Sequence, residues 1–210
     1  MSGSPKSSSK YILYPVIPMS IIAILLTSLA IPRREWNIFH LEYENTTQAT
    51  SYIDLFGVEC EPKSEPFGQQ ICDNQNTGKN ASSSMKATFG MMILAVVFGT
   101  TAILLTILAL AECQEQYLLF CFLSCACSFI ALSTTLSGIA ILSLGDQDKV
   151  DRAREDVKRF GMTIRVVPGI CYAFAATATS IYFLVCTLHT AAITIKKLSR
   201  YDDRSIDSMY

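Results

Sequence analysis

Residues 36–72 read WNIFHLEYENTTQATSYIDLFGVECEPKSEPFGQQIC and lie between two apolar runs that are each long enough to cross a bilayer. This polar segment holds the only tryptophan of the chain, Trp36, and a pair of cysteines, Cys60 and Cys72. If the apolar runs on either side cross the bilayer, the polar segment between them must lie at the membrane surface. We therefore expect membrane-spanning helices that carry a folded polar loop.

Four uncharged windows contain most of the apolar residues of this 210-residue chain, which is 50% hydrophobic. A helix needs about 20 apolar residues to cross the hydrocarbon core. The sequence therefore predicts an all-α membrane protein, a four-helix bundle with spans at residues 11–32, 87–111, 117–144 and 165–195. The other segments are tails at 1–10 and 196–210, loops at 33–86 and 145–164, and a turn at 112–116.

The uncharged windows, at residues 11–32, 87–111, 116–145 and 166–195, contain no Asp, Glu, Lys or Arg, and only His189, near the end of the fourth span, is a typical proton carrier. Ionisable groups inside a span usually mark a transport path, so their scarcity argues against a pump, a transporter or a voltage sensor. The net charge of −1, without a basic stripe, argues against a nucleic-acid partner.

The first loop contains strand patterns and a cysteine pair. Residues 36–43 and 51–58 alternate as extended strands do. Cys60 and Cys72 enclose a turn-rich segment without metal-binding companions, and cysteines in an oxidising compartment are usually paired. We predict a Cys60–Cys72 disulfide that contributes about 3 kcal/mol.

The same loop contains two N-glycosylation sequons, which begin at Asn45 and Asn80. Basic residues flank the spans on both sides, so the positive-inside count does not decide the orientation. The sequons and the cysteine pair favour an external loop. We therefore expect both termini in the cytoplasm and the two larger loops outside.

With these features the chain resembles the claudin and peripheral myelin protein superfamily. The resemblance rests on Trp36 shortly after the first span, on Leu55-Phe56-Gly57 followed by Cys60 and Cys72, and on Lys86 before the second span. A second tryptophan is absent, with Phe56 as its nearest substitute, one residue out of step. Eleven residues separate the cysteines, somewhat more than is usual in the family. These departures suggest a divergent branch, such as the invertebrate Clc-like proteins. The resemblance implies a bundle capped by a small extracellular antiparallel sheet, with the disulfide joining two strands.

The remaining patterns indicate packing rather than chemistry. No nucleophile elbow, phosphate loop or metal-ligand cluster occurs in the sequence, so neither an enzyme nor a cofactor is expected. Gly169, Ala173 and Thr177 form a small-residue face that we expect inside the bundle. Cysteines within the spans are interpreted as core residues: Cys121, Cys125, Cys127, Cys171 and Cys186.

Three short segments each leave two interpretations open. Cys113, at the expected cytoplasmic edge, is a palmitoylation candidate or an unmodified turn residue. Ser208-Met209-Tyr210 is a ligand for a PDZ scaffold or an unstructured tail. Residues 145–161 are dense in charge and are expected to continue the third span as a helix. A solvated face is favoured there over a binding patch.

Three functions are consistent with this sequence. The first is cell–cell adhesion or a paracellular barrier at plasma-membrane junctions, where the first loop meets itself or related four-span proteins in cis or trans. The loop at 33–86 has eight acidic and five basic residues, a net charge of −3 that would favour cations along a paracellular path. The alternative is an auxiliary subunit of an ion channel or receptor, similar to calcium-channel gamma subunits. A membrane organiser without selectivity is a third interpretation.

Overall fold

The computed structural model describes residues 8–33, 35–44, 46–53, 55–56, 58–76, 82–111, 116–145, 151, 154–155, 157–159 and 161–207. Within these residues, four helices are long and apolar enough to cross a membrane, and their apolar parts are Lys10–Ala30, Ser83–Ala111, Tyr117–Leu144 and Ile170–Ser199. The predicted four-span architecture is confirmed.

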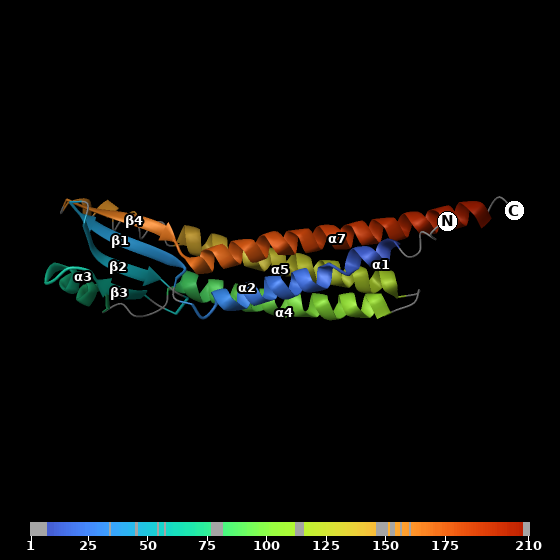
Figure 1. Ribbon diagram of the computed structural model, residues 1–210, viewed down its shortest axis with the longest axis horizontal. Coiled ribbons are helices and arrows are strands. Elements are labelled where there is room, and N and C mark those ends of the chain that lie inside the picture. The colour runs from blue at the N-terminus through green and yellow to red at the C-terminus, as the bar shows by residue number, and fades with distance from the viewer. Residues whose placement is uncertain are drawn as a thin grey trace. The chain divides into compact units, whose positions relative to one another are not determined.

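The helices are shown in Figure 1, and their bounds are α1 Ser8–Leu13, α2 Val16–Ala30, α3 Phe67–Asn76, α4 Ser83–Ala111, α5 Tyr117–Gly145 and α7 Ile170–Asp207. Helices α1 and α2 together form the first span, and Pro15 lies at the break between them. Proline lacks a backbone donor and is tolerated at the start of a helix. The break therefore follows directly from the sequence.

One antiparallel sheet of four strands accompanies the helices: β1 Asn37–Tyr43, β2 Thr46–Ile53, β3 Val58–Pro62 and β4 Met162–Pro168. Their order in the sheet is β3-β2-β1-β4 (Figure 1). The first three strands come from the first loop, and β4 comes from the second. Both loops therefore build one structure.

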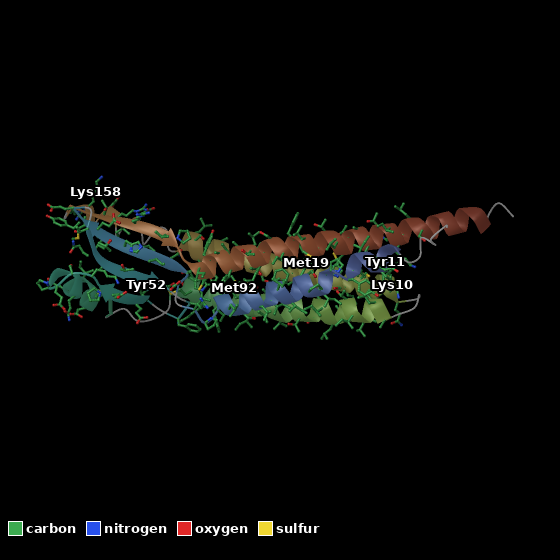
Figure 2. The ribbon with its side chains drawn as sticks, viewed as in Figure 1. Lys10, Tyr11, Met19, Tyr52, Met92 and Lys158 are labelled. Atoms are coloured by element: carbon green, nitrogen blue, oxygen red, sulfur yellow. A yellow bond between two sulfur atoms is a disulfide. The ribbon has the colours of Figure 1, made fainter. Side chains whose placement is uncertain are left out.

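Apolar side chains cover the outside of the spanning helices (Figure 2). Phe122 is 64% exposed, Phe129 61% and Phe183 61%. Large apolar groups would be costly in water, whereas lipid tails solvate them well. The outer surface of the helices thus suits a bilayer.

The chain divides into two compact units. The first consists of Met1–Leu25, Leu94–Thr134 and Thr177–Tyr210, and the second of Leu26–Ile93 and Thr135–Ala176. The first has a core of Leu13, Val16, Ala109, Tyr117, Cys121, Val185 and Ala192. The second contains the sheet and has a core of Ala30, Trp36, Leu55, Met85, Met92, Ile139, Leu142, Cys171 and Ala175.

Three segment boundaries differ from those expected. Residues 51–58 were predicted as one strand, but β2 ends at Ile53 and β3 begins at Val58. The fourth span was expected to begin at 165, where the chain is still in β4. Val166 and Val167 are apolar and β-branched, so hydropathy counts them toward a span although their geometry favours a strand. Helix α7 then continues to Asp207, through most of the segment expected as a tail.

The predicted small-residue face of α7 is wrong. Ala173 and Thr177 lie on the exposed side of the helix, and the buried side carries Cys171, Ala175 and Ala178. Among the span cysteines, Cys121 and Cys171 are buried as expected, while the other three are partly exposed. The predicted continuation of span three falls partly outside the described residues, because α5 ends at Gly145 and residues 146–150 are not described.

Candidate functional site: the disulfide-tied sheet

Trp36 joins the sheet to two helix ends in the second unit. Its side chain is 0% exposed, and its indole Nε1 donates a hydrogen bond of 2.9 Å to the carbonyl oxygen of Ala30, the last residue of α2. Its own carbonyl oxygen accepts a hydrogen bond of 2.9 Å from the Gly169 amide, just before α7. Carbonyl groups at a helix end need such outside partners. Trp36 thus fixes where β1 starts relative to both helices.

The backbone at Gly169 closes this joint. The amide of Cys171 donates to the carbonyl oxygen of Glu35 at 3.1 Å. A Cβ at Gly169 would collide with the same carbonyl. The glycine is therefore needed because no side chain fits between the two backbone segments.

The structure places Leu55 and Trp36 in one core. Leu55 is 2% exposed and belongs to the same core cluster as Trp36. Phe56 beside it is 55% exposed and contacts Phe89 of α4 edge-to-face, with ring centroids 5.4 Å apart. The β2–β3 connection therefore presents one apolar side chain to the core and one outward. Lys86 is exposed in the first turn of α4.

The predicted disulfide between Cys60 and Cys72 is present, with the two Cα atoms 5.2 Å apart. It joins β3 to the helix α3 and not to a second strand, which corrects the pairing of elements that the resemblance implied. The segment that leads into α3 is also attached to β2. The backbone amides of Lys63 and Ser64, before the helix, donate to the carbonyl oxygen of Gln48 at 2.9 and 3.2 Å.

The two faces of the sheet differ in polarity. In the register of the strands, Phe39 lies opposite Ser51 and Val166, on the face that carries Cys60. The other face carries His40 opposite Thr50 and Arg165, in line with Glu61. The neighbouring positions on this polar face add Glu42 and Glu59. Three carboxylates and one guanidinium thus share one side of the sheet.

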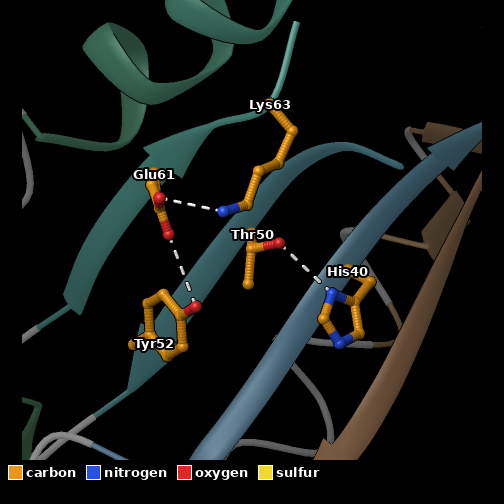
Figure 3. Close-up of polar contacts among 5 residues, drawn as sticks. All are labelled: His40, Thr50, Tyr52, Glu61 and Lys63. Carbon is orange, nitrogen blue, oxygen red and sulfur yellow. Dashed lines mark hydrogen bonds and ion pairs between the residues drawn. The ribbon is translucent and has the colours of Figure 1, made fainter. Parts of the chain in front are cut away.

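Polar side chains are paired across this face (Figure 3). Lys63 Nζ lies 2.8 Å from Glu61 Oε1, and the Tyr52 hydroxyl donates to Glu61 Oε2 at 3.4 Å. His40 Nδ1 lies 3.2 Å from the Thr50 hydroxyl. The hydrogen bond and charge of Lys63 lower the pKa of the Glu61 carboxyl, and Glu61 in turn raises the pKa of the Lys63 ammonium. This exposed pair reduces, but does not cancel, the acidic character of the face.

Several predicted site residues lie outside the described residues. These are the signature glycine, both sequon asparagines, the palmitoylation candidate and the C-terminal tripeptide: Gly57, Asn45, Asn80, Cys113, Ser208, Met209 and Tyr210. The neighbours of position 45 are described. Glu44 has a positive φ of 48°, and the Thr46 hydroxyl donates to the Tyr43 carbonyl oxygen at 2.6 Å, so the residues on either side of position 45 connect β1 to β2.

Comparison with models of known protein families gives no match, and comparison with curated protein sequences gives none either. The functional interpretation therefore rests on the geometry of the sheet and on the resemblance carried by Trp36, Leu55 and the cysteine pair.

Besides strand β4, two features of the structure were missed by sequence reasoning. Helix α3 was missed because its apolar residues are few, although Pro66, directly before it, is a common first-turn residue. The burial of His189 was also missed, since it was expected near the membrane edge. It is 0% exposed and contacts two hydroxyl groups in the first unit.

Proposed function

We propose that this protein acts in cell–cell adhesion or barrier formation at the plasma membrane, through the disulfide-tied sheet on its outer side. The supporting observation is the rigid attachment of the sheet: Trp36 holds its first strand to the ends of two spanning helices. Such a sheet holds a surface at a set position above the bilayer, which contact between neighbouring cells requires. Both termini lie in the cytoplasm, and the chain is a claudin-like protein.

The first experiment asks whether the tagged protein concentrates where two expressing cells touch, in cells that normally form no contacts. The test variant is Cys60→Ser, which releases α3 from β3. Its matched control is Cys127→Ser, a partly exposed free cysteine of α5. Enrichment at contacts that is lost only in Cys60→Ser supports adhesion through the sheet. Uniform surface staining of the wild-type protein would contradict it.

The acidic polar face supports a preference for cations if the sheet lines a paracellular path. Glu42, Glu59 and Glu61 lie on one face, and carboxylates that line a pore favour cations. In expressing cell layers, sodium should therefore permeate more readily than chloride. Equal permeability of the two ions would contradict the cation preference and would favour a barrier or a membrane organiser without ion selectivity.

The second candidate function is an auxiliary subunit of a channel or receptor, and the first sequon favours it. Strand β1 starts at the Trp36 joint and runs away from the helices, so the β1–β2 hairpin lies at the far end of the sheet. A glycan at position 45 would crowd a tight seam between cells. Co-purification of a channel or receptor in stoichiometric amount, without enrichment at contacts, would establish this function instead.

A further inference from the structure

His189 lies at the centre of a hydrogen-bonded cluster that joins three helices of the first unit. Its ring nitrogen Nε2 is 3.1 Å from the Thr106 hydroxyl of α4 and 2.9 Å from the Ser124 hydroxyl of α5. The two hydroxyl oxygens are 2.8 Å apart. The side chains of His189, Thr106 and Ser124 are each 0 or 1% exposed. The cluster is therefore closed to solvent within the spans.

The partners of the ring determine where its proton lies. Nδ1 is 3.0 Å from the carbonyl oxygen of Val185, which can only accept a hydrogen bond. Nδ1 therefore carries the proton, and Nε2 of the neutral ring accepts one from Ser124 or Thr106. The second hydroxyl donates to the Ala102 carbonyl oxygen, which lies 2.8 Å from Thr106 and 2.7 Å from Ser124. Every hydrogen bond of the neutral cluster is satisfied.

A further proton can bind only at Nε2. That nitrogen would become a donor, and both hydroxyl groups would have to turn toward the Ala102 carbonyl. The hydrogen bonds can accommodate this change, but the new positive charge has no counter-ion. A buried charge without a partner strongly destabilises its surroundings.

Among the side chains that the structure describes in the first unit, none is a carboxylate. The apolar core of the same unit takes Leu13 and Val16 from the first span, Ala109 from α4 and the titratable but neutral Tyr117 and Cys121 from α5. The charged side chains described in this unit are all cations: Lys10, Lys196 and Lys197. They would repel a protonated ring rather than stabilise it.

We propose that His189, Thr106 and Ser124 form an intramembrane proton-binding site whose occupation loosens α7 from α4 and α5. The opened bundle, in which water reaches the ring, binds the proton better than the closed one. Lowering the pH therefore shifts the population toward the opened bundle. Below the ordinary titration range of histidine, near pH 6.5, each pH unit raises the opened fraction by up to about tenfold.

The chain suits a direct test because it contains only two histidines, His40 and His189. In the full-length His40→Gln variant labelled with ¹⁵N-histidine, a single imidazole remains. Its spectrum in detergent or nanodiscs at pH 7.5 should be that of a neutral ring protonated at Nδ1. A charged ring, or a neutral ring protonated at Nε2, would overturn the proposal. The His40→Gln variant leaves His189, Thr106 and Ser124 unchanged, so this result would not be an effect of mutating the cluster.

The second measurement follows opening through Cys121, which is 0% exposed and belongs to the same apolar core as Val185, whose carbonyl oxygen accepts from His189. Its labelling by a membrane-permeant maleimide is measured by mass spectrometry at pH 7.5 and 5.5, with His189→Gln as reference for the intrinsic thiol reactivity. The ratio of wild-type to His189→Gln labelling should rise up to about tenfold at the lower pH, and His40→Gln should behave as wild type. An unchanged ratio would refute the proposal.

Discussion

At the residue scale, the molecule depends on a few positions where backbones meet. Gly169 is one of them, because the carbonyl group of Glu35 occupies the space of a side chain. Gly90 of α4 offers a contrast, since nothing lies within 4 Å of the place where its Cβ would be. The same residue type is thus structurally required at one site and free to change at the other.

Replacing these two glycines should have opposite effects. Gly169→Ala forces the start of α7 away from Trp36 and should destabilise the protein by about 1–3 kcal/mol, as overpacking does. Gly90→Ala should be neutral or stabilising by up to about 1 kcal/mol, because alanine has a higher helix propensity than glycine at an exposed position. Thermal unfolding in detergent measures both. Equal stability of the two variants would show that the joint at Trp36 is not as tight as described.

The pair formed by Glu61 and Lys63 predicts a pH effect at the same scale. The pKa of Glu61 lies below the ordinary value of 4.5 because Lys63 donates to it. The pair contributes fully to the stability of the folded protein above pH 4.5. This contribution is lost as the pH falls through the lowered pKa of Glu61. In Lys63→Gln the carboxyl group should therefore protonate at a higher pH.

Cation preference across expressing cell layers, titrated toward acid, would report this difference. The Lys63→Gln midpoint should lie above that of the wild type. The matched control is Lys86→Gln, which removes an exposed lysine at the start of α4 without touching Glu61. If the midpoint of Lys63→Gln equals those of the wild type and of Lys86→Gln, the prediction is wrong.

At the scale of elements, the sequence predicted what periodicity and length determine. The four spans follow from uncharged apolar runs, and β1 follows from the alternation of Phe39, Leu41 and Tyr43. Strand β4 could not be predicted, because it forms only by pairing with β1 across more than 100 residues of chain. Helix α3 depends on its tertiary setting too, since the Cys72 disulfide and the Gln48 carbonyl hold it in place.

Helix α3 should therefore be the element most sensitive to reduction. Removing the disulfide by Cys60→Ser or Cys72→Ser should cost about 3 kcal/mol. The double variant should lose no more than either single one, because each alone breaks the whole bond. Unfolding with and without reductant measures this, and Cys127→Ser should leave the stability unchanged. Additive losses in the double variant would show that the two cysteines act separately.

At the scale of the whole molecule, the two sequons and the cysteine pair of the first loop predict the topology. Tags at both termini should be detected only after cells are permeabilised. A glycosidase that removes N-linked glycans should increase the gel mobility of the protein. Asn45→Gln and Asn80→Gln should each remove one glycan from the wild-type protein. Tags exposed on intact cells would reverse the proposed orientation.

The sheet order has a practical consequence for antibodies. Strand β1 pairs with β2 on one side and with β4, from the second loop, on the other. A soluble antigen cut from the first loop alone would leave β1 as a bare edge, and bare edges pair with one another and aggregate. Antibodies raised against it would recognise a surface that the intact protein covers. A faithful immunogen needs residues 162–168 grafted beside the first loop.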